Sequence, residues 1–292
     1  MAASSTRSTR NDPVITRTLR NPSPLPGFGL AFGVTMTVLS IVVLLPIAAL
    51  LGRGLMIGPV GLWDMLNSPR VWSALVLSFR SALLASLFNL AFGLLLAWVL
   101  VRYRFWGRKL IDAAVDLPFA LPTAVAGIAL TALYAPNGPF GQILDVVGLR
   151  IAYSQAGIWI ALVFVGLPFV VRTVQPVIEE IDREHEEASA TLGASRLMTL
   201  RRVVLPTLTP ALLTGFALAL ARSVGEYGSV IFIAGNLPNQ TEIAPLLIVI
   251  RLEEYNYDAA AAIGIAMLLI SFAMLLAINI IQIWSRRRIG LA

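Results

Sequence analysis

Cysteine is absent from this 292-residue chain, and histidine and lysine occur once each, as His185 and Lys109. The lack of cysteine excludes disulfides, thiolate metal sites, iron–sulfur clusters and cysteine nucleophiles. A single histidine leaves most histidine-based catalysis without its usual groups. Lys109 follows Arg108 instead of the glycine of a Gly-Lys-Ser/Thr loop, so this sequence contains no phosphate-binding ATPase motif of that type.

Charged residues are also scarce, at 13% of the chain, whereas an average soluble protein has roughly 25%. Hydrophobic residues make up 58%, and the mean hydropathy of +0.82 excludes both an ordinary soluble globule and a disordered chain. The net charge of +6 comes from basic residues in short segments between apolar runs. This pattern favours a protein surrounded by membrane lipid over one that binds nucleic acid.

Long uncharged runs predict an all-α, polytopic membrane protein. About 20 apolar residues cross the hydrocarbon core as a helix, and these runs are too long and continuous for barrel strands. Helices are expected because lipid offers the backbone no hydrogen-bond partners. We expect six transmembrane helices, at residues 28–52, 75–101, 113–135, 156–177, 207–234 and 258–284.

Arginine and lysine predict the orientation of these spans, because cytoplasmic loops are enriched in basic residues. Basic residues gather in the N-terminal tail, after the second and fourth spans, and at the C-terminus. Both termini are therefore expected in the cytoplasm. The domains expected are a disordered cytoplasmic tail at 1–27, a transmembrane domain at 28–284 and a basic cytoplasmic tail at 285–292.

The cytoplasmic segment 178–206 stands out from the other connections. Its first third is acidic and its last third is basic, which suits the dipole of a helix. Gly193 can form a turn between two short helices. The segment is either an amphipathic stretch on the membrane surface or a docking element for a cytoplasmic partner. Its apolar anchors are Leu192, Leu197, Met198 and Leu200.

The spacing within this segment resembles the EAA motif of ABC importer permeases. That motif reads E-A-A, three residues, G, nine residues, I, one residue, L-P. Ser189 replaces the second alanine and Val203 replaces the isoleucine, and both changes are mild. The resemblance implies a type I permease-like fold in which this coupling loop contacts an ATPase. The matching residues are Glu187, Ala188, Gly193, Leu205 and Pro206.

The resemblance covers about residues 75–284, and in detail it is to the T-type permease subunit of sulfate/thiosulfate ABC importers. It rests on the stretches at 116–130, 221–238 and 242–264. The family implies alternating-access import of sulfate or thiosulfate across the bacterial inner membrane. The implied partners are a second, W-type permease subunit, two copies of a cytoplasmic ATPase that binds ATP and Mg, and a periplasmic sulfate-binding protein. No cofactor is expected in this chain.

Charged and irregular residues inside the spans are candidates for the translocation pathway. Arg222 and Glu226 lie four residues apart and share a helix face. Ionisable groups at membrane depth usually face a cavity or a partner, so this pair either lines the pathway or locks helices together. Prolines in the third span predict a kink there, with or without substrate contact. The candidate pathway residues are Arg222, Ser223, Glu226, Tyr227, Pro118, Pro122 and Thr123.

Three further polar positions have weaker functional interpretations. Arg80 is expected to extend toward the membrane surface, with attraction of sulfate as the alternative. His185 is expected to be an ordinary loop residue. The outer segment 251–258 is either solvated or a contact for a binding protein.

Other functions remain as alternatives. A permease for molybdate or another oxyanion shares the Gly-Glu-aromatic-Gly pattern of residues 225–228, and anion choice is expected to reside largely in the binding protein. A secondary anion transporter or channel would more often show a repeat on the scale of six spans or several buried acids. An intramembrane protease would need a Ser/His or Asp/Asp pair at one depth, which the sequence does not offer.

Overall fold

The computed structural model describes residues 27–181, 187–189 and 191–289, and within them every regular element is helical. The chain divides into two compact units, residues 1–49 and 50–292, with the boundary inside α2. All but the last residue of the expected N-terminal tail lies outside the described residues. The first elements are α1 (Phe28–Leu39), the π-helical segment η1 (Ser40–Leu44) and α2 (Leu45–Leu66).

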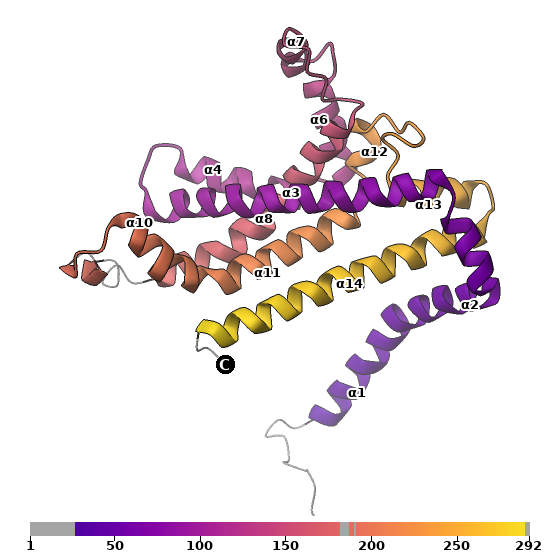
Figure 1. Ribbon diagram of the computed structural model, residues 1–292, viewed down its shortest axis with the longest axis horizontal. Coiled ribbons are helices and arrows are strands. Elements are labelled where there is room, and N and C mark those ends of the chain that lie inside the picture. The colour runs from indigo at the N-terminus through magenta and orange to yellow at the C-terminus, as the bar shows by residue number, and fades with distance from the viewer. Residues whose placement is uncertain (1–26, 182–186, 190, 290–292) are drawn as a thin grey trace, which may run out of the picture. The chain divides into compact units, whose positions relative to one another are not determined.

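The larger unit is built around three long helices that pack lengthwise, α3 (Pro69–Arg102), α8 (Gln155–Glu180) and α11 (Leu205–Val224). Figure 1 shows α14 (Tyr257–Ile289) alongside α11. The short helix α13 (Ala244–Glu253) packs against both α3 and α14. α14 therefore continues through the first residues of the expected basic tail.

Shorter elements connect the long helices. Two of them, α6 and α12, pack against each other although they lie about 100 residues apart in sequence. The segment η2 continues directly into α11, so the coupling-loop side of α11 has no break. These elements are α4 (Arg108–Val115), α5 (Leu117–Ala120), α6 (Thr123–Tyr134), α7 (Pro139–Asp145), α10 (Arg196–Thr199), η2 (Leu200–Val204) and α12 (Val230–Ile233).

Small residues allow the three central helices to approach closely. A side-chain carbon added to Gly93 of α3 would lie 2.9 Å from Val170 Cγ1 of α8. One added to Gly215 of α11 would lie 3.0 Å from Val170 Cα. Helices in lipid gain little from hydrophobic burial against each other, so close packing through small residues contributes much of their association. Val170 itself is fully buried between these two glycines.

Five helical stretches among the described residues are long and apolar enough to cross a membrane. They overlap five of the six expected spans, with the largest differences at the end of the first stretch (Leu66 instead of residue 52) and at both ends of Arg196–Val224 (expected 207–234). The third expected span, 113–135, is wrong as a single helix, because α4, α5 and α6 replace it. The 12 residues of α6 rise only about 18 Å, which is shorter than the hydrocarbon core.

Proline explains where the third span breaks. Pro118 stands in the first turn of α5, where a missing N–H costs nothing, and Pro122 is the residue directly before α6. The residue before a proline avoids the helical region, and Leu121 is extended, with φ −89° and ψ 135°. The two prolines therefore begin new helices, and they do not kink one continuous helix as the sequence had suggested.

The fifth expected span, 207–234, is also divided. α11 ends at Val224, and Gly225 forms its C-terminal cap. Residues 226–229 then lead without a regular helix into the four-residue α12. The break separates the apolar stretch of α11 from that of α12, and it contains Glu226 and Tyr227, two of the predicted pathway residues.

We expect Gly93→Ala to destabilise the protein by about 1–3 kcal/mol, because the new methyl group would overpack the contact with Val170. Gly264→Ala in α14 is the matched control. There the added carbon would lie 3.7 Å from Leu50, an ordinary contact, and the better helix propensity of alanine should leave stability equal or higher. Thermal unfolding in detergent measures both. Equal midpoints for Gly93→Ala and the wild-type protein would contradict the packing argument.

Candidate translocation site and coupling loop

Two breaks in the helical backbone face each other in the larger unit. A side chain at Gly228, in the break after α11, would collide with Thr123 Oγ1 at the start of α6. A side chain at Gly127 of α6 would collide with the backbone of Ser229. The absence of side chains at these two glycines therefore lets α6 and the segment 225–229 lie in contact. Thr123 and the Gly-Glu-Tyr-Gly segment, both predicted for the pathway, are thus brought together.

Glu226 is the most buried acidic group of this region, with its side chain 1% exposed. Its Oε1 accepts hydrogen bonds of 2.8 Å from both the backbone N–H and the hydroxyl of Ser229. Its Oε2 forms an ion pair with Arg222 Nη1. The carboxylate thus stabilises the irregular backbone before α12 as well as pairing with Arg222, since a buried N–H without a partner is costly.

Arg222 differs from Glu226 in its exposure. Its side chain is 33% exposed, whereas that of Glu226 is 1% exposed, so the positive partner of this neutral pair is the more accessible of the two. The i,i+4 spacing predicted this pairing, and the structure confirms the contact.

Buried polar atoms without partners occur on α3 and on α11, the helix that carries Arg222. Among the described residues, Ser86 Oγ, Asn89 Oδ1 and Ser223 Oγ are buried and have no hydrogen-bond partner. A methyl group at Gly166 would lie 2.6 Å from Asn89 Nδ2 and 3.3 Å from Ser223 Oγ, so two of these side chains share one spot between α3, α8 and α11. Unmet hydrogen-bonding capacity in a packed core is unusual and marks a candidate polar site.

A small cavity of about 10 Å³ continues this polar region, with room for roughly one water molecule. Ser223 and Glu226 line it together with Ser78 of α3. The remaining predicted pathway residues lie at different places. Tyr227 packs on the hydrophobic core that contains Ile158 and Leu162, so it is a partly buried core residue.

Pro118 lies away from this region. Its helix, α5, packs on α8, where the rings of Phe119 and Phe169 meet edge to face at 5.1 Å. Leu162, which lines the small cavity, precedes Phe169 by seven residues, or about 10 Å along the helix. Pro122 is exposed and places Thr123, but the structure does not bring Pro118 to the Glu226 site.

Arg172 forms a charged cluster that the sequence analysis did not identify. Its guanidinium pairs with Asp112 Oδ1 at 2.7 Å and binds both carboxylate oxygens of Asp116, at 2.7 and 2.8 Å. It also donates to Gln175 Oε1 and to the backbone oxygen of Asp112. These bonds tie α4, through Asp112, and the residue between α4 and α5, Asp116, to α8. The i,i+4 spacing of Asp112 and Asp116 was visible in the sequence, but no local pattern indicated that Arg172 is their partner.

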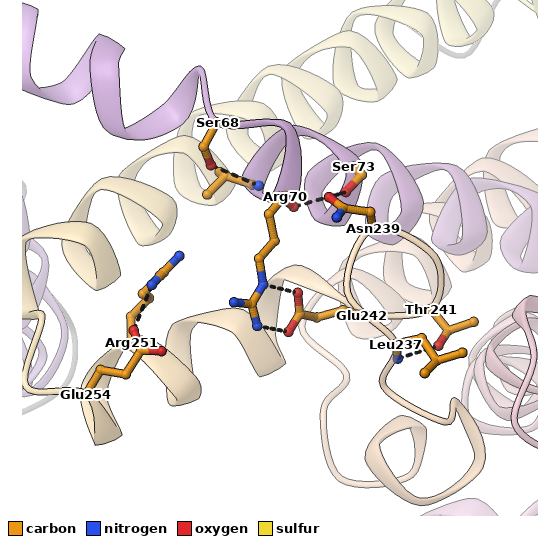
Figure 2. A network of polar contacts seen from close by, with 10 residues as sticks. Ser68, Arg70, Ser73, Leu237, Asn239, Thr241, Glu242, Arg251 and Glu254 are labelled. Atoms are coloured by element: carbon orange, nitrogen blue, oxygen red, sulfur yellow. Dashed lines mark hydrogen bonds and ion pairs between the residues drawn. The ribbon is translucent and has the colours of Figure 1, made fainter.

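A second missed pair joins the start of α3 to the segment before α13. Figure 2 shows the Arg70 guanidinium opposite the Glu242 carboxylate, with two hydrogen bonds of 2.7 and 2.8 Å. The Glu242 side chain is 1% exposed. Nearby, Ser78 Oγ accepts a hydrogen bond from the backbone N–H of Ala244, the first residue of α13. Both contacts fix α13 against α3.

The positions with weaker predictions have these surroundings. Arg80 donates to Gln155 Oε1 at 3.0 Å, and Gln155 in turn donates to the backbone of Gln240, so Arg80 belongs to a hydrogen-bonded chain between α8 and the 234–243 segment. In the outer segment 251–258, Arg251 pairs with Glu254. His185 lies outside the described residues.

The coupling loop is described in part, because residues 182–186 and 190 lie outside the described residues. Glu187 and Ala188 are exposed, and Gly193 has a φ of +82°, a left-handed conformation that glycine adopts without strain. Open space surrounds the position where its side chain would be. The requirement for glycine at this turn is therefore conformational and not steric.

The second half of the loop is helical and presents apolar side chains outward. Ser195 caps α10 by accepting from Met198 N–H, and Pro206 stands in the first turn of α11 next to Leu205. Leu192 is 88% exposed. The residues that follow Leu192 in the chain line a surface hollow of about 260 Å³. They are Ser195, Leu197, Met198, Arg201 and Arg202. Exposed apolar residues beside arginines are typical of a docking surface.

Comparisons with known proteins identify relatives of this chain. The chain is 48% identical over 265 residues to the sulfate transport system permease protein CysT of Salmonella typhimurium, covering 91% of this chain and 96% of that protein. It is 47% identical to the protein of the same name from Escherichia coli, with the same coverage.

Solved structures show the same fold at low sequence identity. A bacterial alginate ABC transporter, solved in complex with an alginate pentasaccharide-bound periplasmic protein, contains a chain that matches with a TM-score of 0.73 and 19% identity. The match covers 89% of this chain and 94% of that one. The family model for the binding-protein-dependent transport system inner membrane component matches residues 89–291. The chain therefore belongs to the family of binding-protein-dependent transport system inner membrane components.

Proposed function

We propose that this chain is a membrane permease subunit of an ATP-driven ABC importer that carries sulfate into the cell. The observation that carries this proposal is the identity of 47–48% to sulfate transport permeases along 91% of the chain. Thiosulfate is the second anion proposed, because it is a tetrahedral dianion like sulfate. The guanidinium of Arg222, exposed beside buried hydroxyls, is suited to the passage of such an anion.

The partners proposed are a second permease subunit of W type, two copies of a cytoplasmic ATPase and a periplasmic sulfate-binding protein. ATP and Mg would bind in the ATPase, since this sequence lacks a Gly-Lys-Ser/Thr loop. The coupling loop supports the assignment because Leu192, Leu197 and Met198 remain exposed in the isolated chain. A docked ATPase would cover them and could pair with Glu187.

Docking of the ATPase would act on the pathway through one continuous helical stretch. α10, η2 and α11 form one helical stretch of 29 residues, Arg196–Val224, about 44 Å long. It starts in the coupling loop and ends beside Arg222 and Glu226. A displacement of the loop by the ATPase would therefore move this stretch and the break after it. Opening of the contact between that break and α6 would expose the irregular backbone at Ser229, whose N–H now donates to Glu226.

The need to release the anion during transport accounts for the pairing of Arg222 with Glu226. A permanently exposed cation in a low-dielectric pathway would bind a dianion tightly and delay its release. Glu226 counters this because it holds the guanidinium of Arg222 on one side. The pair would thus weaken the interaction enough for transport to proceed.

The first test is the composition and the energy source of the complex. We expect purification in detergent to recover a second permease and an ATPase with this chain, and reconstituted sulfate uptake to require ATP. Molybdate should compete more weakly than thiosulfate if the sulfate assignment is right. ATP hydrolysis by the chain free of other proteins, or uptake driven by an ion gradient without ATP, would contradict the proposal.

The second test concerns the coupling loop. Gly193→Leu should lose most ATP-driven uptake while the protein still inserts into the membrane, because a positive φ costs a branched residue about 1–2 kcal/mol and redirects the loop. Gly193→Asn is the matched control, since asparagine tolerates this conformation. Glu187→Ala should weaken ATPase recovery, whereas Glu180→Ala, another exposed acid, should not. Normal uptake and docking in both Gly193→Leu and Glu187→Ala would refute the coupling role.

The third test separates the roles of Arg222 and Glu226. Arg222→Gln keeps a donor for Glu226 but removes the positive charge, so uptake should fall about tenfold or more while the complex assembles. Glu226→Ala should instead reduce the yield of the complex, because the buried N–H of Ser229 loses its acceptor.

A charge-swapped double variant cannot serve as the rescue control that the sequence alone would suggest. An arginine at position 226 cannot accept the hydrogen bonds from Ser229, so the swap would fail even if the ion pair were purely structural. Glu226→Gln is the informative control, because its amide oxygen still accepts them. Unchanged uptake in an assembled Arg222→Gln complex would remove Arg222 from the pathway.

A further inference from the structure

An apolar groove of about 770 Å³ lies between the end of α3 and the start of α11. At about 30 Å³ each, more than twenty water molecules would fit its volume. Yet only Trp98, Tyr103 and Arg104 among its eleven lining residues carry a polar side-chain atom. The groove is therefore unsuited to hold water and suited to hold hydrocarbon. The other lining residues are Ala91, Leu94, Leu95, Val99, Phe105, Leu200, Leu205 and Leu208.

The charged and hydroxyl groups of the lining lie at one end of the groove, while the third polar atom, the indole nitrogen of Trp98, lies within α3. Tyr103 and Arg104 directly follow α3, while Ala91, Leu94 and Leu95 lie two to three turns earlier in the helix. Exposed aromatic residues and basic residues together mark the boundary between hydrocarbon and headgroups. The segment that follows α3 has this composition, with Tyr103 and Phe105 exposed, Trp106 fully exposed, and Arg108 and Lys109 after them.

The charge at this end is positive and available. Among the described residues Arg104 has no carboxylate partner, and its side chain is exposed. The groove thus combines an apolar lining with positive charge at the end that lies at the membrane boundary. This one-ended polarity matches an anionic phospholipid, whose acyl chain is apolar and whose phosphate is negative.

We propose that this groove binds an anionic phospholipid of the surrounding membrane. One acyl chain lies against Leu94, Leu95 and Trp98, and the phosphate pairs with the guanidinium of Arg104. A transmembrane helix of a partner would be apolar along its length and would leave Arg104 uncompensated, so the charge favours a lipid. Because Leu200 and Leu205 line the same groove, the lipid would contact the stretch that joins the coupling loop to α11.

The first experiment identifies the occupant in the native membrane. Photoreactive benzoylphenylalanine replaces Leu95, which is 59% exposed and lines the groove, in the full-length chain within its complex. After irradiation, mass spectrometry should find adducts with phospholipid. Adducts with another protein chain or with residues 1–26 of this chain would overturn the proposal, because they would place a polypeptide in the groove.

The second experiment tests the charge. Native mass spectrometry measures retention of phosphatidylglycerol, added as the probe, on the detergent-purified complex. Arg104→Gln should weaken retention about fivefold, the effect expected of one basic residue near the headgroups. Ala91→Phe, which fills the groove, should weaken it as well. Arg150→Gln removes one positive charge from another exposed position, paired with Asp145, and should change nothing.

Phosphatidylcholine serves as the zwitterionic comparison lipid. Its choline group offsets the charge of the phosphate, so Arg104→Gln should lower its weaker retention less than that of phosphatidylglycerol. Because Arg104 is exposed, Arg104→Gln should fold normally. It therefore still tests the proposal if Ala91→Phe fails to fold. Equal retention of phosphatidylglycerol by Arg104→Gln and the wild-type complex would overturn the proposal. A similar loss in Arg150→Gln would do the same, because it would indicate a general effect of net charge.

Discussion

The need to satisfy backbone hydrogen bonds away from water governs the centre of this protein. Lipid tolerates irregular backbone only where protein covers it. The break after α11 and the start of α6 meet this need together, because Gly127 admits the backbone of Ser229 and Gly228 admits Thr123. The carboxylate of Glu226 supplies the acceptor that the N–H of Ser229 would otherwise lack. If either glycine gained a side chain, the two segments would separate and expose these groups.

In the proposed pathway, the same region would offer hydrogen-bonding capacity to an anion. Glu226 is fully engaged by Ser229 and Arg222, whereas the hydroxyls of Ser86 and Ser223 have no partner among the described residues. A buried acid that is satisfied repels an anion less than a free one, and a buried hydroxyl without a partner can donate to it. The contrast between these neighbours distinguishes the site from an ordinary salt bridge between helices.

Local spacing in the sequence predicted much of this structure. The apolar runs predicted five of the long helices, and the four-residue spacing of Arg222 and Glu226 predicted their contact. The third span was wrong as one helix because hydropathy measures side chains and not backbone geometry, although Pro118 and Pro122 were visible. Arg70 with Glu242 and Arg172 with Asp116 could not be predicted, because their partners lie 172 and 56 residues apart. Local patterns do not encode contacts of that separation.

The pair of Arg70 and Glu242 has a consequence for the order in which the chain matures. At about 5–20 residues per second, synthesis of the intervening 172 residues takes roughly 10–30 s. α3 is complete once Arg102 has been added, yet for the rest of that interval Arg70 has no Glu242 to pair with, and the N–H of Ala244 that donates to Ser78 has not been made. Arg70, in the first turn of α3, can reach the headgroups meanwhile. Docking of α13 onto α3 is therefore a late event of biosynthesis, and it joins the first half of the protein to the last.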